Sequence, residues 1–256
     1  PRYPLRFAPD YPPSPRAEPV IYPRPPPKKN HAHVPSHAHP SLYHNRPFLL
    51  YFIGRLFSHF SRQIIAVAVG WQVYEITGSA FHLGMVGLVQ FLPTLFLTFN
   101  AGHAADRYNR KRIVQYCQWI EGLAAGFLAW GSLSGSITVL DIYIASAVFG
   151  AASAFERPAA AAMLPNLIST AQLQQGTALS SGAMHIATTA GPMLGGFAMA
   201  FSTGSAYLLC TFFWLCAGLC NGLLRLKHQA GGGGAVTFRS LFAGVHFVRR
   251  NPTLLG

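Results

Sequence analysis

Long apolar stretches, separated by short polar connections, dominate the chain from residue 47 onward. Six of them are predicted, at 48–74, 81–104, 112–132, 137–162, 175–201 and 205–226. A helix of about 20 residues is long enough to cross the roughly 30 Å hydrocarbon core of a bilayer. The pattern therefore predicts an all-α integral membrane protein with six spanning helices.

Basic residues are sorted between alternate connections. The connections at 74–79, 132–136 and 202–205 contain no Lys or Arg. The other connections and the C-terminal region carry Arg107, Arg110, Lys111, Arg112, Arg225, Lys227, Arg239, Arg249 and Arg250. Because Lys and Arg are retained in cytoplasmic loops, we expect the N-terminus and the end of the sixth span to lie in the cytoplasm.

Composition supports membrane insertion and argues against other classes. The chain is 51% hydrophobic and only 10% charged, whereas a soluble domain carries about a quarter charged residues. The net charge of +12 is spread over the tail, loops and C-terminal region, so we expect no nucleic-acid partner. Cys117, Cys210, Cys216 and Cys220 lie in apolar stretches, which favours neither disulfides nor a zinc site. Without a catalytic residue set or a phosphate-binding loop, we expect no enzyme activity, cofactor or metal.

The segments before and after the apolar region are predicted to lie outside the membrane for most of their length. Residues 1–46 are rich in Pro and lack an apolar period, so they are predicted to form a disordered cytoplasmic tail. Its His31, His33, His37 and His39 can converge on a metal ion, although we favour an accidental low-complexity tract. We expect 47–228 to form the helical bundle, and 229–256 a cytoplasmic loop and the start of a truncated further helix.

The connection between the second and third spans reads G-H-A-A-D-R-Y-N-R-K-R from Gly102 to Arg112. It resembles the signature loop of the major facilitator superfamily, G-x-L-A-D-R-x-G-R-K. Ala104 and Asn109 depart from that pattern, and Asn tolerates the left-handed conformation of a tight turn. The resemblance implies a cytoplasmic conformational latch, formed by Gly102, Asp106, Arg107, Arg110 and Lys111. Charges that only fix topology are the alternative.

The fifth predicted span contains a second pattern with a similar resemblance. Gly182 is followed by Gly191-Pro192-Met193-Leu194-Gly195-Gly196, similar to the superfamily's antiporter motif G-x8-G-P-x-x-G-G. The resemblance implies export. Ala183, Ala187, Gly191 and Gly195 also form a stripe of small residues at a spacing of four, so close helix packing is an alternative.

Ionisable residues inside predicted spans are candidates for a substrate or proton pathway, because each is costly in lipid unless it faces protein or water. Arg55, His59 and Arg62, with Gln63 beside them, share one face of the first span and are expected to line a cavity. The alternatives are that Arg55 reaches the membrane surface and that Arg62 pairs structurally.

Three further ionisable residues lie in later spans. Glu121 is either a proton acceptor or a buried structural partner. Glu156 is expected to close the latch by pairing with Arg107 or Arg110, as a carboxylate of helix 4 does in related transporters. His185 either titrates near neutrality or is a satisfied core histidine, and we favour the core position.

Segments at 70–84, 154–159 and 240–256 are similar to the enterobactin-exporter-like branch of the superfamily. The resemblance implies the N-terminal six helices of a 12-helix fold in a bacterial inner membrane, with a C-terminal six-helix half as partner. It implies alternating access with proton-coupled efflux of a small organic molecule, siderophore or drug-like. The alternative is a truncated, non-transporting membrane scaffold or a half-transporter subunit.

Overall fold

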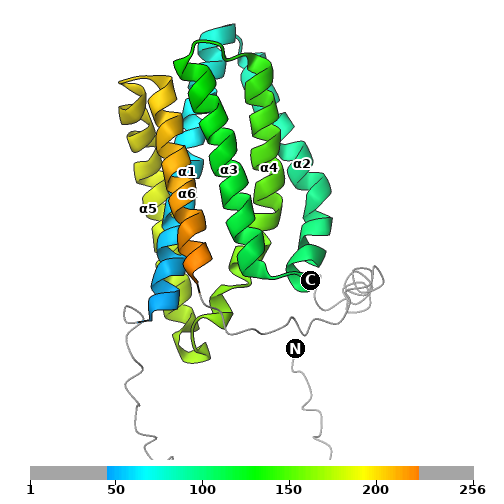
Figure 1. The fold of residues 1–256 in the computed structure, drawn as a ribbon, viewed down its shortest axis with the longest axis vertical. Helices are drawn as coiled ribbons and strands as arrows, with labels where there is room; N and C mark the ends of the chain where they lie inside the picture. The colour runs from blue at the N-terminus through cyan, green and yellow to red at the C-terminus, as the bar shows by residue number, and fades with distance from the viewer. Residues whose placement is uncertain (1–44, 225–256) are drawn as a thin grey trace, which may run out of the picture. The chain divides into compact units, whose positions relative to one another are not determined.

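The computed structural model describes residues 45–224, with the side chains at positions 99, 100, 103, 105 and 106 outside that description. Six long helices account for most of this part of the chain (Figure 1). They are α1 (Arg46–Thr77), α2 (Ala80–Arg107), α3 (Arg110–Leu133), α4 (Val139–Ala161), α5 (Leu173–Met199) and α6 (Thr203–Leu223). Each coincides with a predicted span, and no end differs from the prediction by more than three residues.

Some sequence predictions fall outside these residues. The tail lies outside them apart from Asn45 and Arg46, and Arg46 already belongs to α1. The four tail histidines, the bases from Arg225 onward and the loop at 229–256 also lie outside the described residues.

Local sequence signals explain where the helices begin and end. Asn45 caps α1 by accepting a hydrogen bond from the backbone N–H of Phe48, and Gly78 ends the helix in the left-handed conformation at φ 61°, which glycine adopts without strain. Thr138 and Asp141 form a reciprocal capping box at the start of α4. These short signals allow sharp reversals between long helices.

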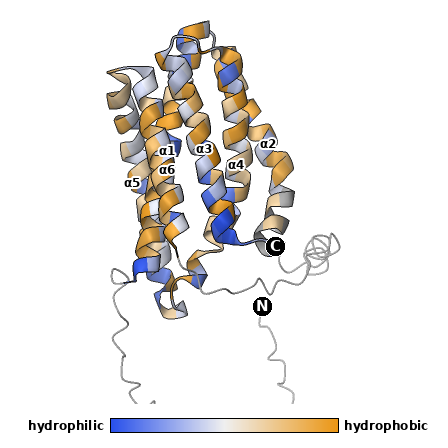
Figure 2. Cartoon of the chain, viewed as in Figure 1, coloured by the Kyte–Doolittle hydropathy of each residue, from blue (hydrophilic) through white to orange (hydrophobic). Residues whose placement is uncertain are grey.

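The helices run alternately up and down, so the connections fall at two opposite ends of the bundle (Figure 1). One end holds the start of α1, the α2–α3 loop and the α4–α5 connection, which contains η2 (Leu164–Asn166) and η3 (Thr170–Gln172). The helix termini at this end carry Arg46, Arg107, Arg110, Lys111 and Arg112, whereas Glu75 and Asp141 belong to terminal turns at the opposite end. Figure 2 shows hydrophilic turns in blue near both ends. Connections that carry basic residues in the sequence therefore lie together at one end of the bundle.

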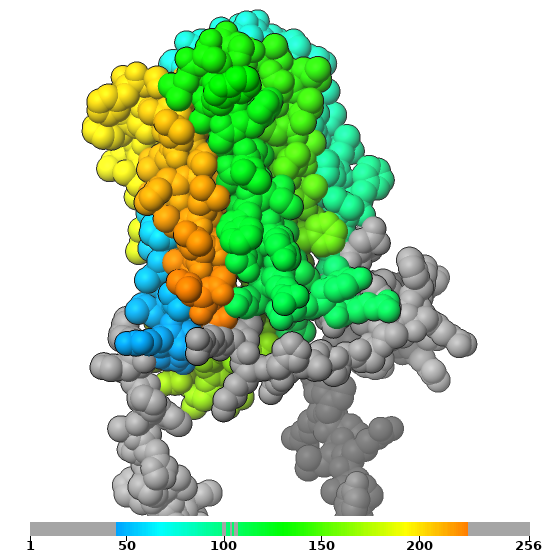
Figure 3. Space-filling model, viewed as in Figure 1, coloured from blue at the N-terminus to red at the C-terminus, as the bar shows by residue number. Residues whose placement is uncertain are grey.

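The helices pack in specific pairs. α3 lies beside α6, α2 beside α4, and α1 beside both α5 and α6; Figure 3 shows α3 and α6 side by side on one face. Glycine permits the closest approaches. A Cβ at Gly150 of α4 would collide with the carbonyl oxygen of Gln90 on α2. There Thr94 donates a hydrogen bond to the carbonyl oxygen of Gly150 at 2.9 Å.

The outer surface of the bundle is apolar. Large side chains such as Trp71, Phe81, Leu123 and Phe201 are exposed on it, and orange hydrophobic residues cover much of the helices in Figure 2. A water-soluble protein rarely exposes so large an apolar surface. The chain is therefore a multi-pass membrane protein.

Helix composition distinguishes two groups of spans. α2, α4 and α6 contain segments long and apolar enough to cross a membrane, at Ala80–Thr98, Val139–Asn166 and Thr203–Leu223. α1, α3 and α5 have sufficient length but a lower apolar content. Apolar composition thus supports three of the six predicted spans, because charged residues in α1 and α3, and the many Gly, Ser and Thr residues of α5, lower the mean hydropathy of the others.

Candidate functional site

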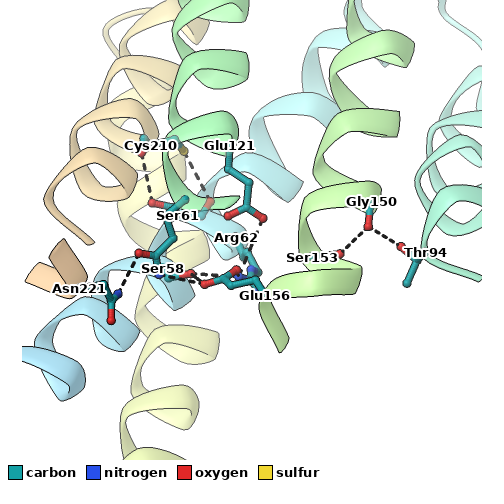
Figure 4. A network of polar contacts seen from close by, with 11 residues as sticks. Ser58, Ser61, Arg62, Thr94, Glu121, Gly150, Ser153, Glu156, Cys210 and Asn221 are labelled. Carbon is teal, nitrogen blue, oxygen red and sulfur yellow. Dashed lines mark hydrogen bonds and ion pairs between the residues drawn. The ribbon is translucent and has the colours of Figure 1, made fainter. Parts of the chain in front are cut away.

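An ion pair connects α1 to α4 in the interior of the bundle. Arg62, near the middle of α1, forms a salt bridge with Glu156 (Figure 4). A second carboxylate, Glu121 of α3, lies with its Oε1 4.0 Å from the same Arg62 Nη2. Both carboxylates are buried, and one guanidinium therefore stands between two acids.

Glu156 is surrounded by hydrogen-bond donors. Its Oε1 accepts hydrogen bonds from Ser58 Oγ at 3.0 Å and from Gln118 Nε2 at 2.9 Å, while its Oε2 faces Arg62. Gln118 in turn accepts a hydrogen bond from Asn221 Nδ2 at 2.9 Å. A buried charge is tolerated when it is paired and hydrogen-bonded in this way, so the network holds Glu156 as a carboxylate.

Glu121 is much less well satisfied. It is only 1% exposed, yet its Oε2 has no hydrogen-bond partner among residues 45–224. Its side chain descends from α3 toward Arg62 in Figure 4. Arg62 at 4.0 Å and the indole of Trp214 face this carboxylate, fewer donors than surround Glu156. A buried carboxylate with few donors is costly in its charged form, which distinguishes Glu121 from Glu156.

Glu121 and Arg62 border a cavity of about 330 Å³. Its wall includes polar residues from four helices, aliphatic residues of α1 and α2, and one aromatic residue each from α4 and α6. The lining includes Arg62, Gln63, Gln90, Glu121, Arg157 and Trp214. A concave site with a few convergent polar groups is the usual form of a small-molecule site.

The predicted face of α1 reaches this cavity in part. Arg62 and Gln63 line it, whereas Arg55 and His59 lie outside its lining. Arg55 and His59 are half-buried, and Arg55, Arg62 and Arg157 act electrostatically on His59. Two of the four residues predicted to line a cavity from this face of α1 therefore do so.

The ion-pair partner of Glu156 differs from the predicted one. The sequence suggested that it pairs with Arg107 or Arg110 at the loop, but the structure places it against Arg62. The reason is depth, because Glu156 lies on the interior face of α4 and is fully buried, while Arg107 is exposed at the end of α2.

The loop residues take other positions. Arg110 donates a hydrogen bond at 3.0 Å to the carbonyl oxygen of Ala162, just after the last turn of α4. Such a cation satisfies a carbonyl and complements the helix dipole. Asn109 has φ −65° and caps α3, so it does not use the left-handed conformation allowed from the sequence. Among the described side chains, none lies within 4 Å of a Cβ placed at Gly102. Lys111 is half-buried, and the side chain of Asp106 lies outside the described residues.

The glycine motif of α5 divides between two faces. A Cβ at Gly191 would lie 2.5 Å from Gln63 Cβ, and one at Gly195 would lie 3.4 Å from Ile64 Cα, so both glycines seat α5 against α1. Ala183 and Ala187 are buried on the same stripe. In the described part of the chain, no atom lies within 4 Å of the position that a Cβ would take at Gly182 or Gly196.

Pro192 and His185 are two further residues of α5 that the sequence brought forward. Pro192 lies inside the helix and removes one backbone donor from its hydrogen-bond ladder. His185 is exposed, so the favoured assignment to a core position is wrong. Periodicity did not reveal which face of α5 lacks a neighbour.

Sequence reasoning missed the uncharged half of the network. Ser58, Gln118 and Asn221 were not singled out, although buried amides and hydroxyls inside apolar helices commonly make interhelical hydrogen bonds. An inspection of every amide side chain in the spans would have found Gln118 and Asn221. The part of the chain seen in the structure holds no cluster of three His, Cys, Asp or Glu residues suited to a metal.

Comparison with known proteins agrees with this geometry. Residues 40–248 match the transmembrane secretion effector family. The chain is 29% identical over 139 residues to the multidrug efflux pump Tap of Mycobacterium tuberculosis, covering 52% of this chain and 33% of Tap.

Two further relatives are similar at comparable levels. The staphyloferrin A transporter of Staphylococcus aureus is 27% identical over 151 residues, covering 57% of this chain and 38% of the relative. The enterobactin exporter EntS of Salmonella choleraesuis is 27% identical over 165 residues, covering 62% and 39%. The matched region spans about a third to two fifths of these curated relatives.

Proposed function

Because the chain belongs to the transmembrane secretion effector family of the major facilitator superfamily, we propose that it is the N-terminal six-helix half of a secondary active exporter. The relatives are efflux and siderophore transporters, and the chain aligns with only part of each. Its working partner is a C-terminal six-helix half, against which the bundle rocks to open the cavity alternately to either side.

One observation carries this proposal. A charged cluster of Arg62, Glu121 and Glu156 lies inside a bundle whose outer surface is apolar, and two of the three line a cavity. Ionisable groups at such depth are costly and mark substrate or ion pathways. A membrane scaffold that only packed against other helices would have no need of them.

The cargo that we propose is a small organic molecule, siderophore or drug-like, exported in exchange for protons. The names of the relatives support both cargo classes. The resemblance of Gly182, Gly191, Pro192, Gly195 and Gly196 to the antiporter motif supports export. Gln63 and Gln90 offer hydrogen bonds in the cavity and Trp214 an apolar surface.

The same proposal sets the orientation of the bundle. The basic end, with Arg107, Arg110 and Lys111, faces the cytoplasm of a bacterial inner membrane, and so does the N-terminus. We assign the loop from Gly102 to Arg112 the role of a cytoplasmic latch. The hydrogen bond from Arg110 to the end of α4 supports a link between the α2–α3 loop and α4.

Proteoliposomes test the function directly. The protein, expressed from its complete gene, is reconstituted with ethidium or enterobactin as probe, with and without a transmembrane pH gradient. We expect flux of at least one probe that depends on the gradient. Flux that is indifferent to the gradient contradicts proton coupling, and absence of flux for both probes favours the scaffold alternative.

A further inference from the structure

The charges of the central cluster do not balance when both acids are ionised. Arg62 is the cation that pairs with both Glu121 and Glu156. Arg157 also acts on Glu121, but it is exposed to solvent, so the buried part of the cluster carries an excess negative charge. An uncompensated charge in this setting is expensive. One bound proton would remove the excess.

Hydrogen-bond geometry indicates which acid takes that proton. Glu156 accepts from Ser58 and Gln118 and faces Arg62, three donors that suit a carboxylate. Glu121 has Arg62 at 4.0 Å and an Oε2 without a partner in the described residues. The neutral acid form therefore belongs to Glu121.

Glu121 is also placed where a proton can arrive. It lines the cavity together with Arg62 and Arg157, and Arg157 is exposed. The titratable and charged groups that face it are Arg62 of α1, Arg157 of α4 and Cys117 of α3 itself, while α6 contributes Trp214. The buried carboxylate is thus in contact with a polar cavity.

We propose that Glu121 is the proton-binding group of this protein and that Arg62 moves from Glu156 toward Glu121 when the proton leaves. The assignment rests on the proposed function. A proton from the cavity bonds to one Glu121 oxygen and converts the carboxylate to the neutral acid. Its release to water on the opposite side of the membrane restores the carboxylate. The structure, with Arg62 on Glu156, corresponds to the proton-loaded arrangement.

This exchange links proton binding to helix packing. The salt bridge of Arg62 joins α1 to α4 in one arrangement, and a closer contact with Glu121 joins α1 to α3 in the other. Since an ion pair inside a membrane protein is effectively stronger than one in water, the swap biases the relative positions of these helices. A two-state element of this kind is what alternating access requires.

Infrared titration of the protein in lipid vesicles tests the proton site without any substrate. We expect the wild type to show the C=O stretch of a buried carboxylic acid that disappears as the pH rises. Glu121→Gln should lack this band, whereas Glu75→Gln, the same change at an exposed position, should retain it. Glu121→Asp keeps a carboxyl and should keep a titrating band, which separates proton loss from misfolding.

Two results would overturn the proposal, namely a wild type without such a band, or a Glu121→Gln variant that retains it. Flux provides a second readout. Glu121→Gln should reduce gradient-driven ethidium flux to that of protein-free vesicles, while ethidium exchange without a gradient continues. Undiminished gradient-driven flux in this variant refutes the role of Glu121. A wild type that moves neither ethidium nor enterobactin refutes the proposed function instead, and the infrared titration still decides the proton site.

Discussion

α1 contacts its neighbours in two contrasting ways. Toward α5, the contact is close because Gly191 and Gly195 have no side chains, and Gln63 and Ile64 occupy the space. Toward α3 and α4, the contact consists of charged and amide groups around Arg62 and Glu156. α1 thus has a close-packed interface with the glycines of α5, the glycine interface, and a polar interface with α3 and α4, the charged interface.

The two interfaces have different energetic character. Lipid tails are as apolar as side chains, so close backbone approach and polar contacts hold membrane helices together. The contacts of Gly191 and Gly195 with Gln63 and Ile64 involve no ionisable group, so pH does not change their energy. The charged interface changes its energy with each proton or partner, so it is the one suited to a conformational change.

Removal of Glu156 should give the largest loss of stability. Glu156→Ala leaves Arg62 buried beside an acid at 4.0 Å, and breaking such a pair costs about 3 kcal/mol or more. The free energy of unfolding in detergent micelles measures the loss. Glu75→Ala, at an exposed position, is the matched control and should change the free energy little.

A double variant separates stability from function at the same site. Because apolar residues can replace a buried pair without loss, Arg62→Met combined with Glu156→Met should recover most of the stability lost by Glu156→Ala. Gradient-driven flux should not recover. If it did, the charged interface would have no role in transport.

Physical reasons explain why the helices were predictable from the sequence while the partner of Glu156 was not. Helix lengths were predictable because bilayer thickness fixes them, and capping residues such as Asn45 and Thr138 mark the ends. Spacing also placed Arg62 and Gln63 on a cavity. The partner of Glu156 was not predictable, because it depends on how α1 crosses α4 in space, and spacing within one helix says nothing about that.

Adding a methyl group to the glycine interface should have a smaller effect. Gly191→Ala forces a contact of 2.5 Å with Gln63 Cβ, and overpacking of this kind costs about 1–3 kcal/mol. Gly196→Ala, with nothing within 4 Å of the new carbon in the described residues, should be neutral or stabilising by up to about 1 kcal/mol. Unfolding of both variants in micelles makes the comparison.

The Gly191 and Gly196 pair also tests the meaning of the antiporter motif. If the motif serves packing alone, Gly196→Ala should leave gradient-driven flux at the wild-type level. A stable Gly196→Ala protein that no longer transports would show that this glycine acts at a surface other than the α1 contact. The shape-only description of α5 would then be incomplete.

The smallest effect is expected from a single hydroxyl of the charged interface. Ser58→Ala removes the 3.0 Å hydrogen bond to Glu156 and the 3.0 Å hydrogen bond that Ser58 accepts from Arg62. Because Arg62 and Gln118 still face the carboxylate, the loss should be about 1.5 kcal/mol. Ser153→Ala is the matched control, since buried Ser153 donates only to the carbonyl oxygen of Gly150 in its own helix. Its loss should be within about 0.5 kcal/mol, because that carbonyl also accepts from Thr94. Equal losses for the two serines would mean that the charged interface gains nothing from Ser58 and is held by the salt bridge and by Gln118.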